Sequence, residues 1–126
     1  VSYLTLYAFS TENWNRPQPE VQFLLEILTE IIVKETVNLH KEGVQIKHLG
    51  RLDRLSSELQ SAITKSVELT RDNQGITLSG AFDYGGRTEI LDAVYSSCIA
   101  TNNLCFFVLC TIRKYVLENF HTSWES

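Results

Sequence analysis

The sequence predicts an α/β fold with a partly parallel sheet that is covered by helices. Three short apolar runs alternate with three helical patterns, and this alternation favours parallel strands joined by right-handed crossovers. The chain has 126 residues, of which 44% are hydrophobic, which is enough for one modest core. We therefore expect one α/β-sized unit.

The first half of the chain predicts two strands around one long helix. Tyr3 to Phe9 carries no charge and is rich in leucine and aromatic side chains, as expected of a strand buried on both faces. A helix begins near Pro19, which suits a first helical turn, and its apolar residues recur at intervals of three and four. Gly43 is expected to end this helix, and alternating residues from Val44 to Gly50 predict the second strand.

The second half predicts a helix, a strand and a third helix. Cap-like serine and glutamate residues open a helical pattern from Ser56 to Asn73, and Gly75 to Phe82 reads as a strand. The third helix begins with the run TEILDAVYSS. Two polar loops, Ser10 to Pro17 and Asp83 to Arg87, follow strands. We expect both at the carboxyl edge of the sheet, where ligands collect in α/β folds.

Charge and composition exclude several classes of partner. The 11 basic and 15 acidic residues give a formal charge of −4, which argues against binding nucleic acid. The most apolar segment, Leu104 to Ile112, is far shorter than the roughly 20 residues of a membrane-spanning helix. The spacing of the three cysteines matches no zinc site, which favours a reduced intracellular chain.

The first polar loop offers a hydroxyl, an amide and a guanidinium that can together hold a diphosphate; these belong to Ser10, Asn13 and Arg16. Trp14 adds a rigid apolar plane. The alternative is a simple turn, in which Trp14 fills the core and Arg16 pairs with Glu12 or Glu20. Spacing alone leaves both interpretations open.

The second polar loop is also open to two interpretations. Gly85 and Gly86 precede a predicted helix, so that backbone N–H groups and Arg87 could face an anion there. A tight turn, with Arg87 bonded to a carbonyl or to Glu89, fits equally well. Asp53, between two arginines, is expected to form a solvated, self-paired turn.

Three blocks in the chain closely resemble the cis-prenyltransferases, the undecaprenyl and dehydrodolichyl diphosphate synthases. They read LTLYAFSTENWNRPQPEV, LGRLDRL and ITLSGAFDYGGRTEI, and the resemblance runs from about Ser2 to about Tyr95. It implies a Mg²⁺-dependent condensation of isopentenyl diphosphate with an allylic diphosphate, for polyprenol or dolichol biosynthesis. It also implies an apolar tunnel for the growing chain.

The same resemblance assigns roles to individual residues. Ser10 and Asn13 would be catalytic, orienting the isopentenyl group near the proton that is lost. Binding of substrate and steadying of its loop would fall to four residues, namely Trp14, Arg16, Glu20 and Arg87. The tunnel would be lined by Leu24, Leu28, Ile76 and Leu78.

The departures from the family pattern predict a central fragment. A DGNGRWA-like block would precede Val1 and an RTSGE-like block would follow, so the magnesium carboxylates are expected to be absent from this chain. We expect residues 1–97 to be the central part of the domain and residues 98–126 to be a non-matching tail, from a splicing or gene-model error or a divergent terminus. Asp83 stands where the family commonly has asparagine.

These departures also bear on activity and partners. We expect the chain to be inactive alone and the parent enzyme to be a homodimer or heteromer. The alternative is a non-catalytic binding or scaffold subunit of a prenyltransferase complex. The compartment stays open between cytoplasm, endoplasmic reticulum surface and plastid.

Overall fold

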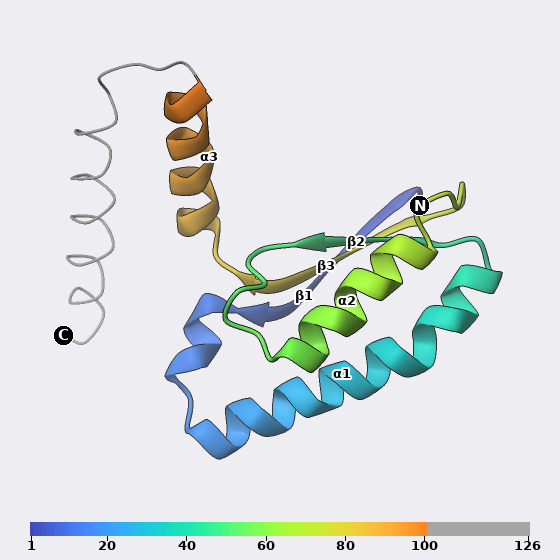
Figure 1. Cartoon of the computed structure of the whole chain (residues 1–126), viewed down its shortest axis with the longest axis horizontal. Helices are drawn as coiled ribbons and strands as arrows, with labels where there is room; N and C mark the ends of the chain where they lie inside the picture. Colours follow the sequence, from blue (N-terminus) through green and yellow to red (C-terminus); the bar gives the residue numbers. More distant parts are fainter. Residues whose placement is uncertain (101–126) are drawn as a thin grey trace. The chain divides into compact units, whose positions relative to one another are not determined.

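The computed structural model describes residues 1–100, which fall into two units (Figure 1). The first unit is Val1–Gly85, and it holds the whole sheet. The second begins at Gly86 and is described only through helix α3, Gly86–Ala100. Nearly all of the predicted tail, residues 98–126, lies outside the described residues, so the boundary at residue 97 stays a prediction.

The first unit is built on a three-stranded parallel sheet. Strands β1 (Tyr3–Ser10), β2 (Gln45–Leu49) and β3 (Thr77–Tyr84) are arranged in the order β1-β3-β2, and both pairs are parallel. The predicted parallel α/β fold is confirmed. Because β3 is central, the ends of β1 and β2 both lie beside the end of β3.

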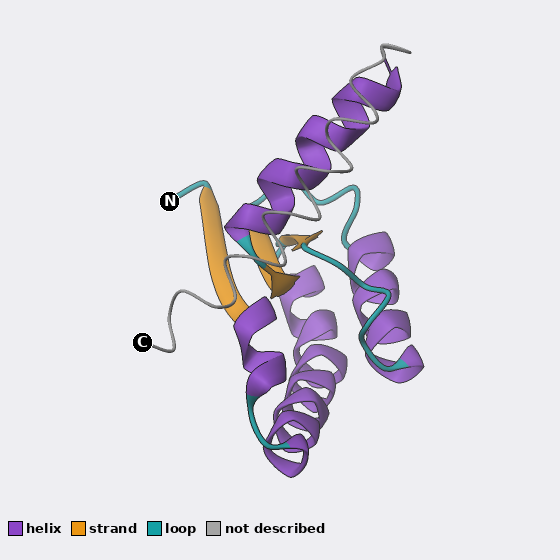
Figure 2. Ribbon diagram, turned by 90° about the vertical axis from the view of Figure 1, so that its left-hand side faces the viewer, coloured by secondary structure: helices purple, strands orange, loops and turns teal. Residues whose placement is uncertain are grey.

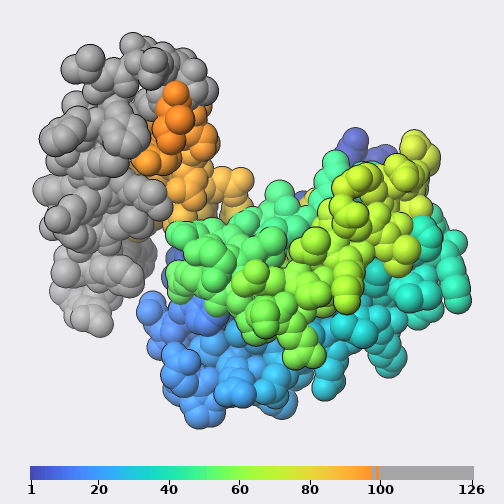
Figure 3. Space-filling view, in the orientation of Figure 1, coloured from blue at the N-terminus to red at the C-terminus, as the bar shows by residue number. Residues whose placement is uncertain are grey.

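Two helices form a second layer, α1 (Gln18–Lys41) and α2 (Ser57–Leu69), and both lie on one side of the sheet in Figure 1. Ser56 caps α2, accepting the backbone N–H of Leu59. Figure 3 shows the two helices in contact along much of their length. Their apolar faces and the ends of β1 and β3 enclose the core, which consists of Phe9, Val21, Leu55, Leu59, Ile63 and Phe82.

The two helices also share a buried pair of hydroxyl groups. The Oγ1 of Thr36 in α1 lies 2.6 Å from the Oγ of Ser66 in α2, and both side chains are buried. Each hydroxyl also bonds a carbonyl one turn back in its own helix, that of Ile32 or of Ala62. These bonds satisfy the polar groups and fix how one helix sits along the other.

The expectation that β1 is buried on both faces is wrong. Tyr3 is 76% exposed and Leu6 50% exposed, and within the strand only Phe9 is buried. Among the described residues β1 pairs with β3 alone, α1 packs mainly on α2, and α2 packs on α1 and on β2. An apolar, uncharged run therefore predicted the strand correctly but not the degree to which its neighbours cover it.

Candidate functional site

Three loops meet at the carboxyl edge of the sheet. The first follows β1 as a short 3-10 helix, η1 (Thr11–Asn15), which Figure 2 shows between β1 and α1. The second joins β2 to α2 and contains residues 50–56, and the third begins at the last residues of β3. Since all three strands are parallel, the loops come together without long insertions.

Asn13 closes the first loop on itself. Its Oδ1 accepts the backbone N–H of Ser10 at 2.8 Å, and its carbonyl accepts the backbone N–H of Arg16 at 3.2 Å. Trp14 turns inward and meets Phe9 edge to face, with ring centroids 5.1 Å apart. These contacts form the turn that was one of the two interpretations, with Trp14 partly buried against the core, and this turn also holds Ser10 and Asn13 beside each other.

Arg16 pairs with Glu20, one of the two partners expected for it. Nη1 of Arg16 lies 2.7 Å from Oε1 of Glu20, and both side chains are about half exposed. An exposed pair one helical turn apart contributes about 0.3–0.5 kcal/mol. Such a pair can be exchanged for a ligand at little cost, so it leaves the guanidinium of Arg16 able to bind an anion.

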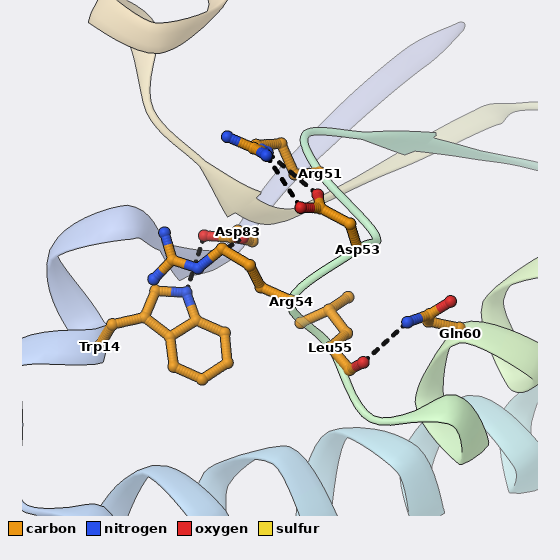
Figure 4. A network of polar contacts seen from close by, with 7 residues as sticks. All are labelled: Trp14, Arg51, Asp53, Arg54, Leu55, Gln60 and Asp83. Atoms are coloured by element: carbon orange, nitrogen blue, oxygen red, sulfur yellow. Dashed lines mark hydrogen bonds and ion pairs between the residues drawn. The ribbon is translucent and has the colours of Figure 1, made fainter. Parts of the chain in front are cut away.

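Asp83 lies at the centre of the site, where it joins the first and second loops (Figure 4). Its Oδ1 accepts the indole N–H of Trp14 at 2.8 Å, and its Oδ2 lies 3.6 Å from Nε of Arg54. The guanidinium carbon of Arg54 in turn lies 4.8 Å from the centre of the Trp14 ring. The three side chains therefore contact one another in a closed triangle.

The backbone at Asp83 is strained and buried. Asp83 has a φ of 46°, and it is the one non-glycine residue with positive φ in the described part of the chain. The residue is 1% exposed, and its carbonyl accepts the backbone N–H of Arg51 at 3.4 Å. Such conformations persist where surrounding contacts enforce them, and they are common at functional sites.

Gly50 allows the second loop to approach β3 closely. Its φ is +100°, and a Cβ built on it would lie 2.2 Å from the carbonyl oxygen of Phe82 and 3.2 Å from the carbonyl carbon of Asp83. Only glycine has both the conformational freedom and the absence of a side chain that this approach requires. Residues 50–56 are consequently held against the end of the central strand.

The self-paired turn expected around Asp53 is confirmed for Arg51 and wrong for Arg54. Nη2 and Nε of Arg51 lie 2.8 and 3.0 Å from the two carboxylate oxygens of Asp53. This hydrogen bonding lowers the pKa of Asp53 below its usual value. Arg54 instead turns toward the buried Asp83, which charge pattern alone could not distinguish from the nearer Asp53.

His48, near the end of β2, packs against Phe82 of β3 and Gly50 of the second loop. Its ring stacks on Phe82 with centroids 5.9 Å apart, Nε2 lies 3.2 Å from the carbonyl oxygen of Gly50, and buried Nδ1 has no hydrogen-bond partner among the described residues. Burial lowers the pKa of His48 below its usual 6.5, although the Gly50 carbonyl acts in the opposite direction. The neutral ring therefore suits this position.

A hollow of about 460 Å³ lies beside Trp14, between α1 and the start of α2. Its lining includes Val21 and Leu25 and three carboxylates, those of Glu26, Glu30 and Glu58. Three acids repel an anionic headgroup. An anion is therefore disfavoured in this hollow.

The predicted tunnel residues lie on two layers of the first unit. Leu24 and Leu28 are partly buried on α1, and Leu28 packs against the core. Leu78 on β3 pairs in register with Leu4 and Ile46, so these three side chains share one face of the sheet. Ile76 precedes β3 and is also partly buried.

Arg87 is the second residue of α3 and so belongs to the second unit. Its side chain is exposed, and it already takes part in a polar or electrostatic interaction. Its predicted role with the first loop stays a prediction.

The described residues do not form a magnesium site. Within residues 1–100 there is no group of three or more histidine, cysteine, aspartate or glutamate side chains that could hold a metal ion. The carboxylates at this edge, Asp83 and Asp53, face donors from Trp14, Arg54 and Arg51 instead. A Mg²⁺ ion prefers several free oxygen ligands, which this arrangement does not supply.

Two residues of this arrangement, Asp83 and Arg54, were not among the sequence-predicted site residues. A usable signal was present, because Val44 to Gly50 also predicts a parallel strand and its following loop must end at the same edge. Three loops, rather than two, were therefore to be expected there.

An α/β unit with polar loops gathered at the carboxyl edge of a parallel sheet is typical of ligand-binding enzymes, and comparison with known proteins makes the class specific. The model of the family described as "Putative undecaprenyl diphosphate synthase" matches residues 1–122. The chain belongs to this cis-prenyltransferase family, as the resemblance of its three blocks predicted.

Curated relatives agree with the family assignment. The isoprenyl transferase of Rickettsia bellii (strain RML369-C) is 50% identical over 93 residues, which are 74% of this chain and 41% of the relative. That of Rickettsia typhi (strain ATCC VR-144 / Wilmington) is 42% identical over 119 residues, 94% of this chain and 48% of the relative. The chain thus spans less than half the length of these relatives.

Solved structures show the same fold. A crystal structure titled as a probable undecaprenyl diphosphate synthase from Campylobacter jejuni matches with a TM-score of 0.74 and 31% identity, over 81% of this chain and 49% of that chain. Lavandulyl diphosphate synthase from Lavandula x intermedia, in complex with dimethylallyl diphosphate, matches with a TM-score of 0.74 and 28% identity, over 81% and 45%. Among the described residues, no helix is both long and apolar enough to cross a membrane.

Proposed function

We propose that this chain provides the isopentenyl diphosphate side of a cis-prenyl diphosphate synthase site, which joins isopentenyl diphosphate to an allylic diphosphate. The observation that carries the proposal is the first loop, where Asn13 holds the backbone of Ser10 at 2.8 Å beside Trp14 and the half-exposed Arg16. This places a hydroxyl, an amide and a guanidinium at the carboxyl edge of the sheet. Membership of the family supports it.

Each residue then has a role that its contacts allow. Arg16 exchanges its weak pairing with Glu20 for a diphosphate oxygen. The amide of Asn13 and the hydroxyl of Ser10 donate hydrogen bonds to the diphosphate of isopentenyl diphosphate and so orient its isopentenyl group, with the proton that is lost directed toward an acceptor. Leu24, Leu28, Ile76 and Leu78 line the path of the hydrocarbon chain, which in the full enzyme would lead to polyprenyl or dolichyl products.

Magnesium would neutralise the departing diphosphate in the complete enzyme. Because the described residues do not form a magnesium site, we propose that the chain by itself binds isopentenyl diphosphate but does not condense it. Incubation with labelled isopentenyl diphosphate, dimethylallyl diphosphate and Mg²⁺ tests this point. Long labelled products from the purified chain would contradict it.

The binding site itself is tested with Asn13→Asp. The new carboxylate keeps an oxygen to accept the Ser10 N–H, so the turn is retained, but it removes the NH₂ donor and adds a negative charge. Loss of one hydrogen bond to a charged ligand weakens binding by about tenfold or more. Calorimetric titration with isopentenyl diphosphate measures this loss.

The matched control is Asn38→Asp, which makes the same change at an exposed position on α1. We expect the control to bind isopentenyl diphosphate like the original chain. Equal affinity of the Asn13 and Asn38 variants would contradict the assigned site, as would the absence of any binding by the original chain.

A further inference from the structure

We propose that Arg54 is a diphosphate-binding residue of this site, held in place by Asp83 and Trp14. The proposal rests on the proposed function for the identity of the ligand. It starts from a contrast among the four arginines of the first unit. Three of them bond through terminal nitrogens to an exposed carboxylate within four residues, in the pairs Arg16–Glu20, Arg51–Asp53 and Arg71–Glu68.

Arg54 is arranged differently from these three arginines. It faces Asp83 through Nε, at 3.6 Å, and its two terminal nitrogens point away from that carboxylate in Figure 4. No hydrogen bond joins those terminal nitrogens to the described residues, and the side chain is 42% exposed. The fork of donors that binds phosphate oxygens in a bidentate manner is therefore presented at the carboxyl edge of the sheet.

Trp14 and Asp83 keep the guanidinium in this orientation. The centre of the Trp14 ring lies 4.8 Å from the guanidinium carbon, and the indole N–H is itself fixed by Oδ1 of Asp83 at 2.8 Å. Asp83 cannot move easily, because its side chain is fully buried and its backbone lies against Gly50. Little side-chain entropy remains for Arg54 to lose when it binds a ligand.

Oδ2 of Asp83 supports this inference independently. The atom is buried, and it accepts no hydrogen bond from the described residues, since the Arg54 contact of 3.6 Å is an ion pair beyond hydrogen-bond distance. A buried carboxylate oxygen without a hydrogen bond is costly. The ion pair with Arg54 offsets part of this cost, so Oδ2 and the guanidinium are held facing each other.

The ligand chemistry follows from position and charge. Arg54 contacts Trp14, which belongs to the same loop as Ser10, Asn13 and Arg16, so its guanidinium lies at the same edge of the sheet as that loop. On the other side of Trp14 the hollow is acidic, which disfavours an anion there. The structure therefore assigns Arg54 to the diphosphate group, which isopentenyl and allylic diphosphates share.

Inorganic pyrophosphate is the first probe, and Trp14 reports its binding. The chain contains two tryptophans, so Trp124→Phe leaves Trp14 as the single tryptophan, which is excited selectively above the tyrosine absorption band. In this background Arg54→Gln is expected to weaken pyrophosphate binding about tenfold or more, by calorimetry and by the change in Trp14 emission. Arg71→Gln, which removes an exposed arginine just beyond the C-terminal end of α2, is expected to change pyrophosphate binding less than about twofold.

Asp83→Asn distinguishes two effects of Asp83 on pyrophosphate binding, namely the positioning of Arg54 and the repulsion of the anion by the negative charge of Asp83. It keeps an acceptor for Trp14 but removes the negative charge that orients Arg54. Electrostatics alone predicts tighter binding of pyrophosphate after loss of a nearby negative charge, whereas positioning predicts weaker binding. We expect weaker binding, and tighter binding would overturn the role of Asp83.

Folding of each variant is checked by far-ultraviolet circular dichroism. If Arg54→Gln does not fold, Arg54→Lys is used in its place to measure pyrophosphate binding. Lysine keeps the charge without the planar fork, so intermediate affinity is expected. A folded Arg54 variant that binds pyrophosphate as well as the original chain overturns the proposal.

Isopentenyl and dimethylallyl diphosphate complete the test. Loss of affinity for one or for both in Arg54→Gln identifies whose diphosphate Arg54 binds. If Asn13→Asp weakens isopentenyl diphosphate binding while Arg54→Gln does not, the proposed function stands and Arg54 is excluded. The proposed function fails instead under a different set of results. In that case Arg54→Gln weakens pyrophosphate binding, isopentenyl diphosphate binds no more tightly than pyrophosphate, and Asn13→Asp does not change the affinity for isopentenyl diphosphate.

Discussion

Gly50 is expected to be the most sensitive glycine at the carboxyl edge, and Gly50→Ala tests how tightly the second loop is held against β3. Alanine at a φ of +100° is strained, and its Cβ would lie 2.2 Å from the Phe82 carbonyl oxygen, which belongs to the backbone and cannot rotate away. A left-handed conformation costs about 1–2 kcal/mol, and a forced backbone shift adds about 1–3 kcal/mol. The total loss of stability is then about 2–5 kcal/mol.

Gly43→Ala is the matched control for this substitution. Gly43 also has a positive φ, +78°, but no atom lies within 4 Å of the Cβ that alanine would add. It therefore carries the conformational cost of about 1–2 kcal/mol without the clash. The difference between the two variants isolates the clash.

Urea unfolding followed by circular dichroism measures the difference. With a denaturant dependence of about 1–3 kcal/mol per molar urea, the clash lowers the midpoint of Gly50→Ala by about 1 M relative to Gly43→Ala. In the Trp124→Phe background, Trp14 emission is also expected to change in Gly50→Ala but not in Gly43→Ala, because the displaced backbone carries Asp83. Equal midpoints and unchanged emission would refute the close approach of the second loop to β3.

Two further substitutions test the helix layer and the packed histidine. Thr36→Val removes a buried hydroxyl bonded to Ser66 and is expected to lower the free energy of unfolding by about 1–2 kcal/mol in urea titrations. The control Thr64→Val, at an exposed hydroxyl on α2, is expected to lower it by less than about 0.5 kcal/mol. Equal losses in the two variants would contradict the buried hydroxyl pair. Because the folded state lowers the pKa of His48, the unfolded chain binds more protons below pH 6.5, so the urea midpoint is expected to fall as the pH decreases from neutrality through this range. His48→Gln is expected to flatten that dependence, and an unchanged slope in the variant would exclude His48 as its source.

The order of elements could be read from the sequence because local rules determine it. Pro19, Gly43 and the capping Ser56 are local signals, and α1 and α2 begin and end within a few residues of the predicted positions. The parallel arrangement followed from the alternation of strands and helices. The exposure of Leu6 could not be read in this way, since an apolar strand looks the same in sequence at the edge of a sheet and at its centre.

In the candidate site, too, local contacts could be predicted from the sequence and long-range contacts could not. The turn around Asn13 and the pairing of Arg16 with Glu20 join residues three or four positions apart, so spacing already suggested them. The bond from Trp14 to Asp83 spans 69 positions and exists because β3 lies between β1 and β2. Strand order is a property of the whole sheet. Without knowing that order, the sequence showed only that Asp83 stands where the family commonly has asparagine.

The contrast between Arg16 and Arg54 shows why long-range contacts decide the chemistry. Both carry the same charge at the same edge, but Arg16 is restrained only by Glu20, an exposed partner on its own segment. Arg54 is restrained by a buried carboxylate from β3 and an aromatic ring from η1, so two other elements fix its direction before any ligand arrives. A preorganised guanidinium loses less entropy on binding and keeps its donors at a defined angle. For a diphosphate that must be held in one orientation, Arg54 is therefore the better anchor, whereas Arg16, half exposed and paired with an exposed carboxylate, suits a contact that forms and breaks with each substrate.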